Sequence, residues 1–346
     1  MKAAVFDEFQ GPLLIRDVPV PEVPPDAVLI EVRACGICRS DWHGWMGHDS
    51  DVHLPHVPGH ELAGIVSQTG ELVTKFHRGD RVTVPFSCGC GRCVQCESGN
   101  QQICDYYTQP GFTQWGAFAE FVLIRHADVN LVHLPNSIDF VTAASLGCRF
   151  ATSWRGVVCQ GRLSAGEYVA VHGCGGVGLS AIMIASALGG QVIAVDIQEN
   201  RLATAKSCGA IAVVNASEVN DVSGEIQRLT TGGAHLSIDA LGSRQTCYNS
   251  IACLRKRGRH IQIGLTLGTE RDPAVPMSAV IARELEILGS HGMQAFEYPP
   301  MLRLIECGIL QPHLLLGETV SLQTACQILP EMNRFPGQGV VVIDQF

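Results

Sequence analysis

The sequence has little charge, and most of the charge it has is negative. Charged residues make up 16% of the 346 positions, and 33 acidic residues against 24 lysines and arginines give a net charge of −9. A protein that binds nucleic acid through its phosphates needs a basic patch or stripe. This composition provides none, so we expect no nucleic-acid partner.

The sequence also lacks the segments that direct a chain into a membrane or out of the cell. The N-terminal stretch MKAAVFDEFQ has no apolar signal core, which predicts a cytoplasmic protein. The longest stretch without a charged residue or histidine, 173–195, contains six glycines, whereas a membrane-spanning helix needs a sustained apolar run. We therefore expect no membrane partner.

Cysteine, by contrast, is abundant. The 15 cysteines are an odd number, which argues against a complete set of disulfides, and the cytosol keeps thiols reduced. Cys90, Cys93, Cys96 and Cys104 form a C-x2-C-x2-C-x7-C motif. Four thiolates around one tetrahedral ion describe a structural zinc site, and an iron–sulfur cluster is the alternative. Cys88 lies just outside this motif, and we expect no role for it.

The pattern of expected secondary structure changes near residue 150. Before that point, short β-like runs such as 28–33, 62–66 and 81–84 are separated by proline and glycine. After it, short apolar strands alternate with helical segments, which predicts a parallel sheet covered on both faces. The expected strands are 168–171, 192–195, 211–214, 236–239, 260–263 and 285–288, with helices at 177–188 and 244–254 among them. Six strands are the full number of the doubly wound dinucleotide-binding fold.

The last part of the chain does not extend this alternation. It contains two helix-like segments, 296–307 and 322–332, and a terminal apolar strand, 340–343. This part could return to the first domain, but periodicity alone does not show it.

A glycine-rich loop follows the first strand of the alternating region. In Gly173-Cys-Gly-Gly-Val-Gly178, the first glycine permits a tight turn, Gly175 lets the backbone approach a pyrophosphate, and Gly178 lets helix and strand pack closely. Asp196 ends the next strand, where a carboxylate binds ribose hydroxyls and repels a 2′-phosphate. The pattern predicts an NAD site, and a plain glycine-rich turn with an N-capping aspartate is the alternative.

A second set of metal-binding residue types is dispersed along the chain. Cys38, His60 and Cys148 would supply two thiolates and one imidazole, which leaves the fourth position of a zinc ion open, as in catalytic sites. Their spacing alone does not bring them together. Taken singly, each could equally be an ordinary core residue.

These motifs together resemble the zinc-dependent medium-chain alcohol dehydrogenases over nearly the whole chain. The segments Cys38-Arg-Ser-Asp-Trp-His43, Pro58-Gly-His-Glu61 and Leu146-Gly-Cys-Arg-Phe150, the four-cysteine motif and the glycine loop occur in the family's order. The resemblance implies an α/β protein with two domains. A groES-like β-rich catalytic domain is expected over 1–149 and 290–346, with the zinc lobe at about 88–104, and a six-stranded Rossmann domain over 150–289.

The resemblance also implies roles for particular residues. Cys38, His60 and Cys148 would bind the catalytic zinc, which gives two zinc ions per chain, and Glu61 would be an alternate ligand. Asp41 would orient the ligand imidazole, and Ser40 and His43 would relay the proton of the alcohol. The positions expected to bind the cofactor are Arg39, Thr152, Gly173, Gly175, Gly176, Val177, Gly178, Asp196, Arg201, Leu241, Leu265 and Ser290.

Other positions bear on the substrate and on cofactor affinity. Phe86, Trp45 and Trp115 could line the substrate pocket, although ordinary core packing explains them nearly as well. In the stretch 337–340, Val340 stands where some relatives carry an arginine for the pyrophosphate. Cys148 stands where polyol dehydrogenases of the family usually carry glutamate, which favours simple alcohols.

The expected function is therefore an NAD-dependent, zinc-dependent alcohol dehydrogenase that interconverts primary or secondary alcohols with aldehydes or ketones. Zinc would polarise the alcohol oxygen. A polyol or glutathione-adduct dehydrogenase is the alternative on the same fold, and a non-catalytic nucleotide-binding protein is a remote one. By resemblance we also expect a homo-oligomer, a tetramer rather than a dimer.

Overall fold

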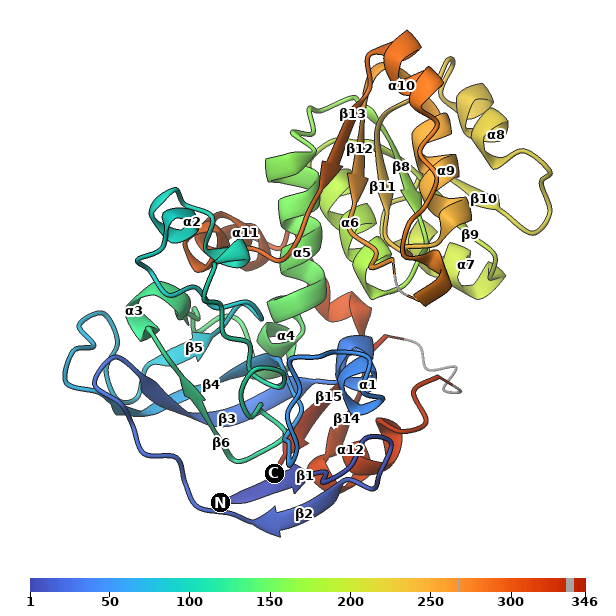
Figure 1. Cartoon of the computed structure of the whole chain (residues 1–346). Coiled ribbons are helices and arrows are strands. Elements are labelled where there is room, and N and C mark those ends of the chain that lie inside the picture. The colour runs from blue at the N-terminus through green and yellow to red at the C-terminus, as the bar shows by residue number, and fades with distance from the viewer. Residues whose placement is uncertain (267, 334–338) are drawn as a thin grey trace. The chain divides into compact units, whose positions relative to one another are not determined.

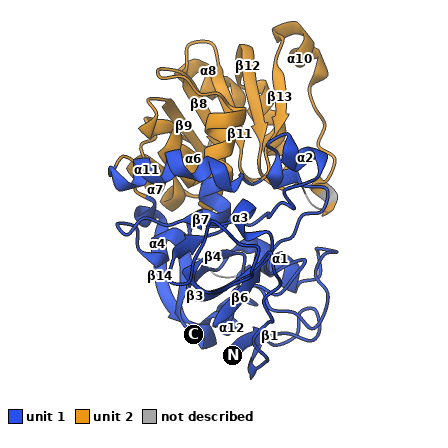
Figure 2. Cartoon of the chain, turned by 90° about the vertical axis from the view of Figure 1, so that its left-hand side faces the viewer, with its two compact units in different colours: residues 1–151, 292–308, 312–346 blue, residues 152–291, 309–311 orange. Residues whose placement is uncertain are grey.

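The structure is a computed structural model that describes residues 1–266, 268–333 and 339–346 (Figure 1). The chain forms two compact units, coloured separately in Figure 2. Unit 1 comprises Met1–Ala151, Gly292–Gly308 and Pro312–Phe346, and unit 2 comprises Thr152–His291 and Ile309–Gln311. No helix in the described ranges has both the length and the apolar character needed to cross a membrane.

Unit 1 is built around a seven-stranded sheet. Its longest pair is β3 (Val28–Gly36) against β4 (Glu61–Thr69), which run antiparallel. The order is β14-β15-β3-β4-β5-β7, and β6 also pairs with β3. The remaining strands of this sheet are β5 (Arg81–Thr83), β6 (Phe121–Ile124), β7 (Val132–His133), β14 (Leu316–Ser321) and β15 (Val340–Gln345). A separate antiparallel pair joins β1 (Lys2–Val5) to β2 (Leu14–Asp17).

The C-terminal strand completes the sheet that the N-terminal part begins. Val342 and Ile343 of β15 pair with Gly36 and Cys35 of β3. The apolar residues of β3 explain why the strand is central, because Val28, Ile30 and other alternate residues are fully buried in the core of unit 1.

The helices of unit 1 are short and mark the ends of strands and loops. They are α1 (Arg39–Trp45), α2 (Val94–Glu97), α3 (Ala127–Asn130), α4 (Phe140–Ala144), α11 (Tyr298–Glu306) and α12 (Leu322–Ile328), with 3-10 turns Gln101–Ile103, Ala295–Glu297 and Pro312–Leu315 and a π turn Leu146–Phe150.

Two helices of this unit differ from the expected bounds. The segment 296–307 begins as a 3-10 turn, and α11 starts only at Tyr298, with proline in its first turn, where the missing N–H is tolerated. The segment 322–332 ends at Ile328, because Pro330 has no N–H with which to continue the helix.

Unit 2 contains a six-stranded parallel sheet in the order β10-β9-β8-β11-β12-β13, the doubly wound order. Its strands are β8 (Tyr168–His172), β9 (Gln191–Asp196), β10 (Ala212–Asn215), β11 (Ala234–Asp239), β12 (Leu254–Gln262) and β13 (Glu286–Gly289). Its helices are α6 (Gly176–Ala187), α7 (Glu199–Ser207), α8 (Val222–Leu229), α9 (Arg244–Ala252) and α10 (Met277–Arg283), with a 3-10 turn Gly268–Glu270 and a π turn Arg155–Gln160. α5 (Ala151–Trp154) connects the two units in sequence.

All six expected strands are present, and this confirms the fold class. One strand bound differs from the prediction by more than two residues, because β12 begins at Leu254 rather than at residue 260. Its first half is the polar run Arg255–Arg259, which contains no apolar alternation. The pairing of β11 with β12 shifts register between Ala234 and Leu236, so a bulge accommodates these residues.

A row of polar side chains crosses the core of unit 2. His172 contacts Cys253 at 3.8 Å, and Cys253 donates to Ser237 at 3.5 Å. Ser237 bonds to Ser250 at 2.7 Å, and Ser250 bonds to His260 at 2.8 Å. Burial lowers the pKa of His172 from 6.5 to about 3 and the pKa of His260 to about 4. Both imidazoles are therefore neutral in the folded protein at neutral pH.

We expect acid to destabilise unit 2 through these two histidines. The unfolded chain takes up a proton on each near pH 6.5, whereas the folded chain does so only near pH 3 to 4. Stability is therefore present above pH 6.5 and is lost as the pH falls below it, by about 2 kcal/mol per histidine at pH 5. Urea unfolding at pH 7 and pH 5 measures the change in the free energy of unfolding. This change should be smaller in His172→Leu than in the unmodified protein. His53→Asn, at an exposed position, is the control, and equal losses in all three proteins would refute the expectation.

Candidate active site and cofactor loop

The carboxylate of Asp41 organises the first group of predicted site residues. Cys38 precedes α1, and its backbone N–H donates to Asp41 Oδ2 at 2.9 Å. Asp41 Oδ1 accepts from Gly59 N at 3.0 Å and lies 2.8 Å from His60 Nδ1. Because Nδ1 carries the proton of this bond, the lone pair of His60 lies on Nε2.

His60 Nε2 is buried and has no hydrogen-bond partner among the residues that the structure describes. Cys148 reaches the same place from the π turn Leu146–Phe150. One donor atom each from Cys38, His60, Glu61 and Cys148 lies within 4.8 Å of all the others. The structure therefore brings together the three residues that the sequence could not connect by spacing, and Ser40 Oγ lies 3.8 Å from Cys38 Sγ.

The chemistry of this donor set fits a zinc ion. A hydrogen bond from Cys148 holds the pKa of Cys38 well below its usual value, while donating that bond, together with burial, holds the pKa of Cys148 well above it. Burial would lower the pKa of His60, but Asp41 and Cys38 outweigh it and hold that pKa well above its ordinary range. A divalent cation would displace the protons that these donors share. Two sulfurs and one imidazole nitrogen suit zinc.

Glu61 is part of this group and is paired with an arginine that the sequence analysis missed. Arg149 Nη2 lies 2.7 Å from Glu61 Oε2, and Arg149 Nε donates to Oε1 at 3.1 Å. Burial raises the pKa of Glu61 to about 7, even though Arg149 acts in the other direction. A signal was available, because Arg149 is the only charged residue in the stretch 140–154, and an isolated charge in an apolar run predicts a buried partner.

His43 lies half-buried in α1 with a second histidine beside it. Its Nδ1 is 3.0 Å from Nδ1 of His48, and the edge of the Trp42 ring contacts both imidazoles. Burial lowers the pKa of His43, and the cation of Arg39 and the neighbouring His48 add to this effect. Arg39 itself donates to Asn333 at 2.8 Å and lies over the Trp42 ring. The sequence analysis did not identify His48.

The aromatic residues proposed for the substrate pocket separate into two groups. The ring of Phe86 contacts His60 edge-on, with centroids 6.3 Å apart, and Phe112, which the sequence analysis missed, does so at 5.4 Å. Trp45 instead lines a cavity of about 460 Å³ and donates to Gly11 O. Trp115 lines a cavity of about 230 Å³ and donates to Pro55 O. Neither cavity is lined by a candidate metal ligand.

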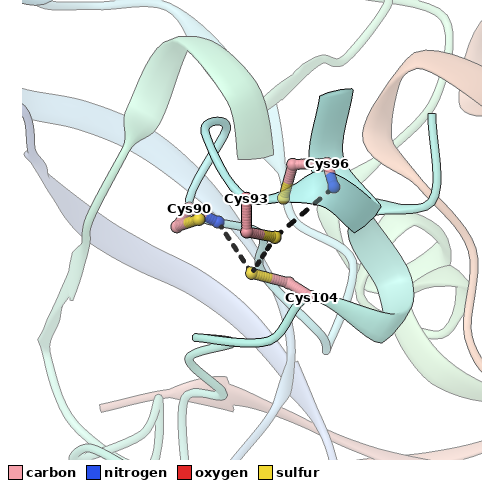
Figure 3. Close-up of side chains that lie close together, drawn as sticks. All are labelled: Cys90, Cys93, Cys96 and Cys104. Atoms are coloured by element: carbon pink, nitrogen blue, oxygen red, sulfur yellow. Dashed lines mark hydrogen bonds between the residues drawn. The ribbon is translucent and has the colours of Figure 1, made fainter. Parts of the chain in front are cut away.

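The four-cysteine motif forms a compact cluster of buried thiols (Figure 3). All four sulfurs lie within 4.8 Å of one another, and those of Cys93 and Cys104 are 3.6 Å apart. Zinc–sulfur bonds of about 2.3 Å in a tetrahedron place sulfurs about 3.8 Å apart, so the cluster fits a zinc ion. The N–H of Cys96 lowers the pKa of Cys93 to about 7. Cys88 stays outside this cluster, and burial raises its pKa to about 12.

The glycine loop lies between β8 and α6 in unit 2, and each glycine has its own structural reason. Gly173 has φ +92°, which other residues rarely adopt. A Cβ atom on Gly178 would lie 1.7 Å from Gly173 O, so helix and strand pack too closely for any side chain. A Cβ atom on Gly175 would meet no atom within 4 Å, so the chain leaves open space there.

Asp196 lies at the end of β9, beside this loop. Its Oδ2 accepts from Cys174 N at 2.7 Å, and its Oδ1 accepts from Ile197 N and Gln198 N. Arg201 Nη1 is 4.0 Å from the same carboxylate. These bonds fix the orientation of a carboxylate at the carboxyl end of a parallel strand, where such folds bind ligands.

The other predicted cofactor positions occupy similar places in unit 2. Leu241, Leu265 and Ser290 follow β11, β12 and β13, and the two leucines are more than half exposed. Ser290 Oγ is buried without a hydrogen-bond partner in the described ranges. Gly176 and Val177 form the first turn of α6, and Thr152 is buried. Val340 is a buried residue of β15, while Gly337 and Gln338, named with it in the sequence analysis, lie outside the described residues.

The fold and the donor sets define a zinc-binding dehydrogenase. Two family descriptions match the chain: the alcohol dehydrogenase GroES-like domain over residues 24–136 and the zinc-binding dehydrogenase domain over residues 176–306. An NAD-dependent alcohol dehydrogenase of Sulfurisphaera tokodaii is 32% identical over 99% of both chains, and an alcohol dehydrogenase of Rhizobium meliloti is 36% identical over 84% of both.

Solved structures agree with these relatives. A crystal structure of an NAD-dependent alcohol dehydrogenase covers all of both chains with a TM-score of 0.90 at 32% identity. The alcohol dehydrogenase TADH from Thermus sp. ATN1 does so with a TM-score of 0.92 at 29% identity. The chain therefore belongs to the zinc-dependent medium-chain alcohol dehydrogenase family, which confirms the resemblance found in the sequence.

Two of the four glycines of the loop, Gly175 and Gly178, should respond differently to alanine. Gly178→Ala should lower the temperature of unfolding, because its Cβ atom would overlap Gly173 O. Gly175→Ala should leave that temperature unchanged, because Gly175 has φ −80° and open space around its Cβ position. It should still weaken NADH binding about tenfold, measured by fluorescence, by filling the space beside the pyrophosphate. Equal unfolding temperatures for Gly178→Ala and the unmodified protein would contradict this account.

Proposed function

We propose that this protein is an NAD-dependent, zinc-dependent alcohol dehydrogenase that interconverts small primary or secondary alcohols with aldehydes or ketones. The observation that carries the proposal is the convergence of Cys38 Sγ, His60 Nε2 and Cys148 Sγ within one group of donors. A zinc ion held there would polarise the alcohol oxygen, and bound NAD would accept the hydride.

The residues around these donors hold them ready for the ion. Asp41 fixes the tautomer and the orientation of His60 through a bond of 2.8 Å. The backbone bond between Cys38 and Asp41 keeps the first ligand at the start of α1. Phe86 and Phe112 pack against the imidazole and exclude water from one side of it.

We propose that Ser40 and His43 carry away the proton that the alcohol releases. Ser40 Oγ lies beside the ligand Cys38, and a hydroxyl can accept one proton while it donates another. His43 is half-buried, and its contact with the exposed His48 gives it a route to water. His43 therefore acts as the outer base.

The cofactor is assigned to the glycine loop and the residues near it in unit 2. The glycine loop and the N-terminus of α6 would bind the pyrophosphate, and Asp196 would bind the adenosine ribose. A carboxylate at that place disfavours the 2′-phosphate of NADP. Arg39, Thr152, Arg201, Leu241, Leu265 and Ser290 complete the proposed set.

Two zinc ions per chain, a cytoplasmic location and a homotetramer complete the proposal. The four-cysteine cluster is fully enclosed by its own thiols, so its zinc would be structural. The tetramer and the location follow only from the sequence analysis.

Metal analysis together with an alcohol screen tests the proposal. We expect two zinc ions per chain, one in Cys104→Ser, and turnover of NAD with small alcohols that stops when the catalytic zinc is removed. The same screen includes polyols and glutathione adducts of aldehydes. Faster turnover of either class would show that it, and not the simple alcohols, is the substrate class. Full activity in protein stripped of zinc would refute the role of the metal.

Ser40→Ala tests the proton path. We expect kcat to fall about 100-fold, as removal of a general acid–base group typically does, while NADH still binds. Ser207→Ala, which removes an exposed hydroxyl in α7, is the matched control. If the Ser40→Ala variant keeps the rate of the unmodified protein, Ser40 does not carry the proton.

A further inference from the structure

We infer that Arg149 is a positioning residue that keeps Glu61 off the catalytic metal and so keeps the fourth coordination position open. The inference rests on the proposed function, because it assumes a metal at Cys38, His60 and Cys148. It concerns the role of Glu61, the fourth donor of the group.

Glu61 is close enough to close the site. Its carboxylate belongs to the same group of donor atoms, all within 4.8 Å of one another. A tetrahedral zinc ion with three protein ligands has one position left, and a fourth protein ligand turns an open site into a closed one. With Glu61 bound, substrate would have to displace it.

Arg149 occupies both carboxylate oxygens. Its Nη2 lies 2.7 Å from Oε2, its Nε donates to Oε1 at 3.1 Å, and its backbone N–H reaches Oε1 at 3.4 Å. Nη2 also donates to Ile37 O at 2.7 Å, which anchors the guanidinium to the backbone just before Cys38. A planar fork that binds both oxygens fixes the direction of the carboxylate, and a lysine cannot reproduce it.

The surroundings leave Glu61 few other partners. Its side chain is fully buried, and that of Arg149 is 13% exposed. A Cβ atom on Gly36 would lie 2.4 Å from Glu61 Oε2, so the carboxylate packs directly against the backbone of β3. A buried carboxylate that loses its paired guanidinium is left with an uncompensated charge, which is strongly unfavourable. Without Arg149, the metal is the cation within reach.

The two roles are also coupled along the chain. Arg149 follows Cys148 in the π turn Leu146–Phe150, so one turn delivers both a metal ligand and the cation that restrains the competing ligand. Turns of this kind are frequent at functional sites.

The test uses the full-length protein loaded with Co²⁺ in place of zinc, without alcohol or NAD. The readout is the change in the visible absorption of cobalt when imidazole, a neutral ligand for the fourth position, is added. The four-cysteine site has no free position, so it cancels in the difference spectrum. The variants are Arg149→Met, Arg149→Lys, Glu61→Gln and the double variant Arg149→Met with Glu61→Gln.

We expect Arg149→Met to bind imidazole at least about tenfold more weakly than the unmodified protein, because Glu61 takes the fourth position. Glu61→Gln in the same chain should restore binding, which a purely structural defect would not allow. The affinity of Arg149→Lys for imidazole should lie between the affinities of Arg149→Met and the double variant. Arg259→Met, which breaks the similarly buried pair with Glu167 in unit 2, should bind imidazole like the unmodified protein.

Equal imidazole affinity in Arg149→Met and the unmodified protein would overturn the inference and leave the proposed function intact. If Arg149→Met does not fold, equal affinity in Arg149→Lys and the unmodified protein would overturn it instead. If Cys148→Ser holds as much cobalt as the unmodified protein, the metal is not at this site, and the proposed function itself fails.

Discussion

The site in unit 1 depends on one carboxylate that joins three separate pieces of backbone and side chain. Asp41 accepts the N–H groups of Cys38 and Gly59 and the Nδ1 proton of His60, and it is buried. It therefore fixes the start of α1, the loop before β4 and the tautomer of the imidazole at once. A buried carboxylate is stable only where hydrogen-bond donors surround it, and Asp41 has three of them. The positions of the candidate metal ligands Cys38 and His60 follow from these bonds.

The second requirement of the site is a vacant place, and it comes from a balance of charges. In the proposed zinc site, two thiolates would neutralise the divalent ion, and Arg149 neutralises Glu61 separately. The ion with its two thiolates would form one neutral group, and Glu61 with Arg149 forms another. Glu61 would then not compete with the other donors for the ion. In unit 2, space is kept in a different way, because the loop carries no side chain at Gly175. One vacancy is electrostatic and the other is steric.

The sequence predicted the elements and the local motifs well, and it failed where distant residues meet. The strands of unit 2 followed from their apolar composition, but the first half of β12 did not, since its polar residues carry no periodic signal. The four cysteines could be grouped because they are close in the chain. Cys38, His60 and Cys148 could be grouped only by resemblance, because spacing holds no information about how β3, β4 and the turn at Leu146–Phe150 approach one another. The isolated charge of Arg149 indicates a buried partner but not which residue that partner is, and no pattern in the sequence describes the contacts of Phe112 and His48.

The pairing of β15 with β3 has a consequence for the order in which the chain matures on the ribosome. Residues 152–291 form nearly all of unit 2 and emerge as one continuous stretch, so their sheet can form during translation. The sheet of unit 1 instead waits for Val342 and Ile343, which are made after unit 2 and pair with Gly36 and Cys35, just before Cys38. Until they are made, β3, which ends two residues before the candidate ligand Cys38, keeps part of one edge unpaired. This part of β3 can therefore pair with a competing strand during the interval in which residues 152–291 are made.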